Sequence, residues 1–151
     1  MASDFPKKII LITAVIILGL LQHLDIFNIF GVKPNLIFAF LLAVCFFEVG
    51  FLFYLILVGM AYLLLRLNFY FDLSVSALCL LLIFGYGLAK IFPWQQIVNL
   101  MFLLIMLNVA FYLTLSPQFL INNTSLLMGE ILYNLVLGSI FYSSFRKLLK
   151  V

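Results

Sequence analysis

The stretch DIFNIFGVKPNLIFAFLLAVCFFEVGF, residues 25–51, decides the fold of this chain. Within it, the turn-forming group Gly31-Val32-Lys33-Pro34-Asn35 interrupts apolar sequence and is followed at once by more of it. Gly31 allows the chain to turn, and Pro34 suits the first turn of a helix, where its missing N–H costs nothing. Asn35 then enters the next segment at its polar end. We therefore expect a tight hairpin between two apolar helices.

The composition of the whole chain indicates whether its surface faces water or lipid. Of its 151 residues, 68% are hydrophobic and 9% are charged, and the mean hydropathy is +1.35. A soluble domain has about 45–50% apolar and about 25% charged residues, and a domain of this size keeps much of its chain at the surface. That surface must face lipid. The expected fold class is an all-α integral membrane bundle, with residues 1–151 as a single polytopic domain.

The apolar runs predict about six transmembrane helices, because a hydrocarbon core of about 30 Å needs about 20 helical residues. The run 35–65 would be about 46 Å long as one helix, so it is either one overlong helix or two short ones. In the second case we expect a turn at Glu48-Val49-Gly50, where Gly50 can take the left-handed conformation that such a turn often needs. The expected helices are residues 8–24, 35–47, 51–66, 74–91, 95–115 and 124–145.

Positive charge favours six crossings over five, because Lys and Arg accumulate in cytoplasmic loops. Six crossings with both termini inside place six cations inside and two outside, whereas five crossings from a cytoplasmic N-terminus place three inside and five outside. We therefore expect a multi-pass protein of the cell membrane with both termini cytoplasmic. The expected cytoplasmic cations are Lys7, Lys8, Lys90, Arg146, Lys147 and Lys150, and the external ones are Lys33 and Arg66.

A polar stripe on the last expected helix is the main candidate for function, because ionisable groups within a membrane are costly and mark functional sites. Glu130, Asn134 and Gly138 recur every four residues and so share one helix face. We expect this face to point into the bundle, with Arg66 or Asn108 as partner of the carboxylate. Two interpretations stay open: a polar clamp between helices, or a carboxylate that binds a ligand, a proton or a partner helix.

Enzyme chemistry, metal binding and nucleic-acid binding find no support in the sequence. It contains no GxSxG, HExxH or P-loop motif. The one histidine, His23, has no second ligand near it, and Cys45 and Cys79 lie in apolar runs without metal-binding spacing. We expect no catalytic residue, cofactor or metal. The net charge of +3 comes from cations that flank the membrane segments, where they meet lipid headgroups rather than nucleic acid.

The hairpin resembles that of the MreD family, the small membrane subunit of the bacterial rod-shape machinery. In that family a Gln near the end of the first helix precedes a Phe-Gly-Val-x-Pro-Asn/Asp-Leu turn and a second helix rich in Leu and Ala. This chain has Gln22, then Phe30-Gly31-Val32-Lys33-Pro34-Asn35-Leu36 and IFAFLLAV. The likeness in residues covers about 22–44. Arg66 and Phe69-Tyr70-Phe71 interrupt the region where the family has a Gly-Leu-x-x-Asp pattern, so the chain resembles a divergent member.

The resemblance implies a noncatalytic scaffold in the bacterial cell-shape, or elongation, complex for peptidoglycan synthesis. Such a subunit would lie in the bacterial inner membrane and act by docking its helices against those of partners. The implied partners are an MreC-like bitopic protein and wall-synthesis membrane enzymes, with the MreB filament contacted indirectly. Gly31, Pro34 and Asn35 would shape the turn that meets a partner.

An alternative class is the six-helix substrate-binding S-component of an energy-coupling-factor vitamin transporter. Such a subunit needs a pocket near the outer face with several convergent polar and aromatic groups. The short outer loops of this chain favour the scaffold. The side chains that could line a pocket are Arg66, Asn68, Tyr70, Asp72, Glu130 and Tyr133.

Overall fold

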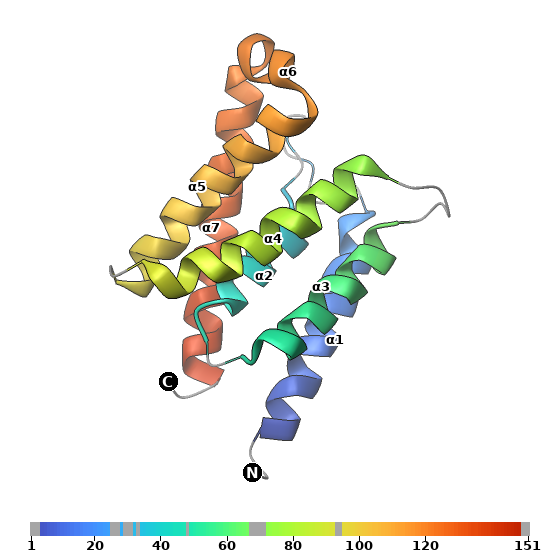
Figure 1. Cartoon of the computed structure of the whole chain (residues 1–151), viewed down its shortest axis with the longest axis vertical. Helices are drawn as coiled ribbons and strands as arrows, with labels where there is room; N and C mark the ends of the chain where they lie inside the picture. Colours follow the sequence, from blue (N-terminus) through green and yellow to red (C-terminus); the bar gives the residue numbers. More distant parts are fainter. Residues whose placement is uncertain are drawn as a thin grey trace.

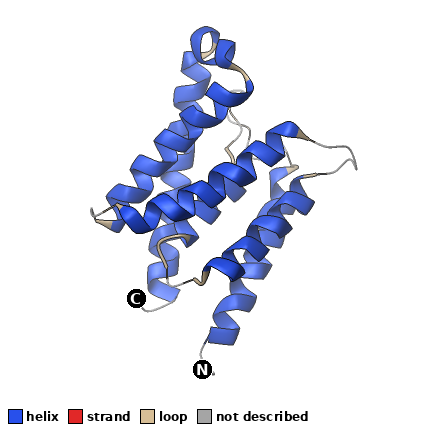
Figure 2. Cartoon of the chain, in the orientation of Figure 1, coloured by secondary structure: helices blue, strands red, loops and turns tan. Residues whose placement is uncertain are grey.

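The computed structural model describes residues 4–24, 28, 32, 34–47, 49–66, 72–92 and 95–148. Within them the elements are all helices (Figures 1 and 2), and four, α1, α4, α5 and α7, are long and apolar enough to cross a membrane. The expectation of an all-helical membrane protein is thereby confirmed. The helices are α1 (Asp4–Gln22), α2 (Leu36–Val44), α3 (Phe51–Leu65), α4 (Leu73–Ile91), α5 (Gln96–Leu115), α6 (Pro117–Asn122) and α7 (Thr124–Leu148).

The short helix α2 forms the centre of the bundle. Its nine residues are all buried, and it contacts α1, α3, α4, α5 and α7. Figure 1 shows it between α4 in front and α7 behind. A helix that is apolar on every side is stable only when it is enclosed, and LIFAFLLAV has no polar side to present to water. At about 13 Å, α2 is too short to cross the hydrocarbon core by itself.

The run 35–65 is two helices, separated by residues 45–50. After α2 the backbone tightens: Phe46 N–H donates to Ala43 and Phe47 N–H to Val44. The Val49 carbonyl accepts a hydrogen bond from the Tyr86 hydroxyl of α4 at 2.8 Å. Hence the break is held to a neighbouring helix as well as by local turns.

Gly50 does not use the left-handed conformation that a glycine could adopt in such a turn. Its φ is −61° and its ψ is 142°, which is extended backbone, and it serves as the N-cap residue of α3. Its carbonyl accepts the N–H of Tyr54 at 3.0 Å. An N-cap residue takes an extended conformation, so the chain enters α3 without a left-handed residue at this position. Glu48, also part of the expected turn, lies outside the described residues.

The remaining helices surround α2 in the order α1, α3, α4, α5 and α7, each in contact with the next. The start of α1 and the end of α7 lie at the same end of the bundle (Figure 1). Five of the six described Lys and Arg residues lie near helix ends at this end of the bundle. Among the described residues, only Arg66, which follows α3, lies at the opposite end. These five are Lys7, Lys8, Lys90, Arg146 and Lys147.

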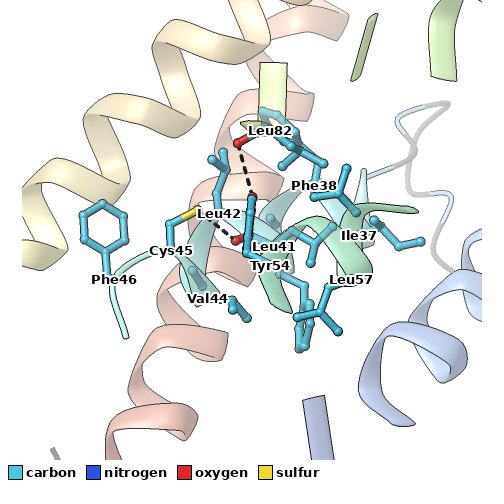
Figure 3. Close-up of a cluster of buried hydrophobic side chains, with 14 of the residues drawn as sticks. Ile37, Phe38, Leu41, Leu42, Val44, Cys45, Phe46, Tyr54, Leu57 and Leu82 are labelled. Atoms are coloured by element: carbon cyan, nitrogen blue, oxygen red, sulfur yellow. Dashed lines mark hydrogen bonds between the residues drawn. The ribbon is translucent and has the colours of Figure 1, made fainter. Parts of the chain in front are cut away.

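Aromatic and aliphatic side chains fill the space between α2, α3 and α4 (Figure 3). Tyr54 is fully buried, its hydroxyl donates to the Leu82 carbonyl at 3.3 Å, and its ring stacks on that of Tyr86 at 4.7 Å. The Cys45 thiol donates to the Leu41 carbonyl at 3.3 Å. Both Cys45 and Cys79 are free thiols, so packing and these local hydrogen bonds, rather than a disulfide, hold this region together.

Candidate functional site

Side chains from two other helices meet the backbone at the start of α2. The N–H of Asn35 donates to Asn134 Oδ1 of α7 at 3.0 Å, and the N–H of Leu36 donates to Gln22 Oε1 of α1 at 2.7 Å. Asn35 itself caps α2, because its Oδ1 accepts the N–H of Phe38 at 3.1 Å. The first N–H groups of any helix lack partners within it, and α2 is buried from its first residue onward. The three amide side chains therefore complete the buried end of α2.

Gln22 contacts both sides of the turn. Its Nε2 donates to the Pro34 carbonyl at 3.0 Å while its Oε1 accepts from Leu36. Pro34 is buried and has no N–H of its own. The turn therefore presents the Pro34 carbonyl and the Leu36 N–H to Gln22, and one carboxamide can bind both. The last residue of α1 thus fastens the hairpin through a donor and an acceptor.

Asn134 extends this network to α5. Its Nδ2 donates to Asn108 Oδ1 at 3.2 Å, and Asn108 Nδ2 donates to the Leu104 carbonyl at 2.8 Å. Asn134 is 0% exposed and Asn108 is 3% exposed. We call the residues Gln22, Pro34, Asn35, Asn108 and Asn134 the amide network. It joins α1, α2, α5 and α7 at one buried point.

The two longest helices pack in an antiparallel register with a step of four residues. From one end to the other, Tyr112 meets Glu130, Asn108 meets Asn134, and Leu104 meets Gly138. A Cβ at Gly138 would lie 2.6 Å from Leu104 Cδ1, so the bare glycine allows the helices to approach. Rows of residues four apart are the ridges that interlock when helices pack. The predicted stripe Glu130, Asn134 and Gly138 is therefore the α7 side of the contact with α5.

Glu130 has a different partner from the two that we expected. Its Oε2 accepts a hydrogen bond from the Tyr112 hydroxyl of α5, and among the described residues it makes no hydrogen bond to Arg66 or Asn108. Asn108 pairs with Asn134 instead. Arg66 donates from Nη1 to the Tyr62 hydroxyl at 3.3 Å, with its guanidinium 5.7 Å from the ring centroid. The stripe thus includes Asn108 as a direct contact, whereas Arg66 lies against its own helix.

Tyr112 also fixes the short helix α6. Its ring stacks on that of Phe119, with centroids 4.7 Å apart and planes 15° apart. One tyrosine therefore links α5 to α7 through its hydroxyl and to α6 through its ring. Sequence reasoning missed Tyr112, although a signal was present: it lies four residues after Asn108, so the polar spacing of α7 is repeated on α5. Gln22 had been noted only as part of the resemblance.

The other predicted residues fall into two groups. Gly31, Asn68 and Tyr70 lie outside the described residues. Asp72 is a helix cap, because its Oδ1 accepts the N–H of Ser74 at 2.8 Å, so its carboxylate is engaged by the backbone of α4. The described part of the chain contains no group of three His, Cys, Asp or Glu side chains that could hold a metal ion.

These features define a class: an all-helical membrane bundle built around a buried amide network. No protein-family model, curated protein or solved structure matches the chain.

Proposed function

We propose that this chain is a noncatalytic scaffold subunit of the bacterial cell-shape machinery, which serves peptidoglycan synthesis in the inner membrane. The observation that carries the proposal is a pair of hydrogen bonds: Gln22 Nε2 donates to the Pro34 carbonyl, and Gln22 Oε1 accepts from the Leu36 N–H. Gln22 and the Pro-Asn-Leu turn are the two parts of the resemblance to the MreD family, and in this chain they bind each other. Of the residues that carry the resemblance, Gln22, Pro34 and Leu36 are thus joined directly.

The amide network supports a structural role for the polar residues. Asn35, Asn108 and Asn134 direct hydrogen bonds to one another or to helix backbone, and Glu130 receives a hydroxyl from a neighbouring helix. Buried polar groups that bind across helices hold a membrane bundle in one arrangement. A bundle held in this way presents fixed outer faces, which is what docking against partner helices requires.

The proposed topology has six crossings with both termini in the cytoplasm. Its support is the concentration of five described cations at the end of the bundle where the chain begins and ends, since positive charge accumulates on the cytoplasmic side. The α2 segment would complete its crossing with non-helical residues, and α3, with 15 residues, would do so with the flanking chain or a locally thinned bilayer.

The test is purification of the tagged chain from native membranes in mild detergent, followed by identification of what copurifies. We compare the wild type with Pro34→Ala and with Pro117→Ala, since Pro34 is buried in the network and Pro117 is exposed at the start of α6. The expected result is that an MreC-like bitopic protein and wall-synthesis enzymes copurify with wild type and Pro117→Ala, and are reduced with Pro34→Ala. Size-exclusion profiles of the purified variants check that each is folded.

Two results would contradict the proposal. Capture of a pair of ATPases with a membrane coupling subunit would move the chain to the S-component class of vitamin transporters. Capture of none of the cell-shape proteins by folded wild type would remove the scaffold assignment altogether.

A further inference from the structure

A groove lies between the start of α5 and the end of α7, at the end of the bundle opposite Glu130. Its volume is about 930 Å³, and it is open to the outside. The floor is apolar and ordered: the Phe47 ring lies 5.5 Å from the ring of Tyr142, whose hydroxyl donates to Gln96 Oε1 at 2.7 Å. The rim carries two exposed cations, Arg146 and Lys147.

Within the described part of the chain, no ion pair involves Arg146 or Lys147. Asp4 begins α1, and the other acidic residues of that part are Asp72, which caps α4, and Glu130, which binds Tyr112. Asp72 and Glu130 are at the other end of the bundle. Ser143 and the amide of Gln95 lie on the same rim and can donate hydrogen bonds. The groove is therefore suited to a group with negative charge and several acceptor oxygens.

A second hollow, of about 310 Å³, continues from the first along the outer side of α7. The two share Ser143 and Lys147, and the second extends to Ser139 and Ile140, about a turn further into the helix. Ile140 is 53% exposed, which in a membrane bundle means that it faces lipid. A bound molecule would thus have its charged end at Arg146 and Lys147 and an apolar part directed toward the hydrocarbon.

We infer that this pair of hollows is a binding site for an anionic phospholipid, with the phosphate at Arg146 and Lys147 and an acyl chain along Ser139 and Ile140. Cations at the end of a transmembrane helix attract anionic headgroups, and basic pockets between helices are a known form of such sites. The second hollow faces lipid and favours a bound lipid over a soluble phosphate compound, because only the lipid has an acyl chain to place there. The inference does not depend on the proposed cell-shape function.

The experiment measures phosphatidylglycerol binding to the purified full chain in a neutral phosphatidylcholine background, by native mass spectrometry and by the rise in Tm. The test variant is Arg146→Gln/Lys147→Gln. The matched control is Lys7→Gln/Lys8→Gln, which removes the same charge at the same end but outside the groove. We expect about thirtyfold weaker binding in the test variant, as follows from the loss of two interfacial cations at about 1 kcal/mol each, and less than a twofold change in the control.

A second variant, Ser143→Trp, keeps both cations and fills the part shared by the two hollows. It should also weaken phosphatidylglycerol binding about tenfold, and its Tm in neutral lipid shows whether the fold is retained. If the test and control variants lost phosphatidylglycerol binding equally, the lipid would be bound by general surface charge and not at the groove. If a folded Ser143→Trp bound phosphatidylglycerol as the wild type does, the lipid would not occupy the two hollows. Competition by millimolar glycerol 3-phosphate, or preferred binding of an acidic peptide, would also overturn the inference.

Discussion

Asn134 accepts a hydrogen bond at 3.0 Å from the backbone N–H of Asn35, a residue 99 positions earlier in the chain. The same carboxamide donates to Asn108, so one side chain joins α2, α5 and α7. Asn134→Ala should therefore lower the free energy of unfolding by about 1–3 kcal/mol, the cost of leaving a buried N–H unpaired. The measurement is equilibrium unfolding in mixed micelles.

The matched control for this change is Asn122→Ala, since Asn122 is exposed on α6. Its effect should stay within about 0.5 kcal/mol, as for most surface substitutions. If the two variants are equally stable, the amide network does not hold the bundle.

Gln22 needs both of its amide atoms. Gln22→Met, which removes donor and acceptor, should destabilise the chain by about 1–3 kcal/mol. Gln22→Glu at pH 7 keeps an acceptor for the Leu36 N–H but sets a carboxylate oxygen against the Pro34 carbonyl oxygen. Because two acceptors repel each other and a partly buried charge is costly to desolvate, Gln22→Glu should be no more stable than Gln22→Met. Thermal unfolding of the three proteins in the same detergent tests this. Wild-type stability in Gln22→Glu would show that the bond to Pro34 contributes nothing.

Gly138 sets the distance between α5 and α7. Gly138→Val should destabilise the bundle by about 1–3 kcal/mol through overpacking, because even a Cβ would lie 2.6 Å from Leu104 Cδ1. Gly87 is also helical but has nothing within 4 Å of an added Cβ, so Gly87→Val should be neutral or slightly stabilising.

A double substitution separates this clash from other effects. Leu104→Ala removes the side chain that Gly138→Val would meet, so the two changes together should cost less than the sum of their separate costs. Strict additivity in unfolding measurements would mean that Gly138 and Leu104 are not in contact.

The pair Tyr112 and Glu130 should show a coupling energy of its own. In a double-mutant cycle with Tyr112→Phe and Glu130→Met, each of which removes one partner of the bond, we expect about 0.5–1.7 kcal/mol, the range of hydrogen bonds between membrane helices. Tyr133→Phe, combined with the same Glu130→Met, serves as control, because Tyr133 is a half-buried tyrosine on α7 itself. Coupling that is equal in the two cycles would speak against the bond from Tyr112.

The proposed topology predicts which ends are accessible to a membrane-impermeant maleimide. In a Cys45→Ala/Cys79→Ala background, Asn122→Cys should react in intact cells, and Ser144→Cys should react only after permeabilisation. Both positions are exposed, on α6 and near the end of α7. The reverse pattern would invert the bundle in the membrane, and reaction of both in intact cells would contradict six crossings with cytoplasmic termini.

The sequence was sufficient for those features that depend on composition and local pattern. A chain with 68% hydrophobic and 9% charged residues can expose its side chains only to lipid, which leads to an all-helical bundle. The four-residue spacing of Glu130, Asn134 and Gly138 identified a helix face that does point at a neighbour, because a helix brings such residues to one side whatever surrounds it.

Partner choice was harder to predict. Glu130 was expected to meet Arg66 or Asn108 and instead meets Tyr112, since the antiparallel register of α5 and α7 aligns Asn108 with Asn134. Gly50 could have been left-handed in the turn and is extended, because it caps α3. Neither result follows from local sequence, which contains no information on the axial offset between two helices.

By itself, the sequence determined that this protein is a helical membrane bundle with a polar hairpin before α2 and a polar stripe on α7. Only the tertiary structure decided that these two features are one site. The N–H of Asn35 and the amide of Asn134 are 99 positions apart, and no local propensity relates them. They meet because α2 is enclosed by its neighbours, so the N–H groups at its start take partners from other helices.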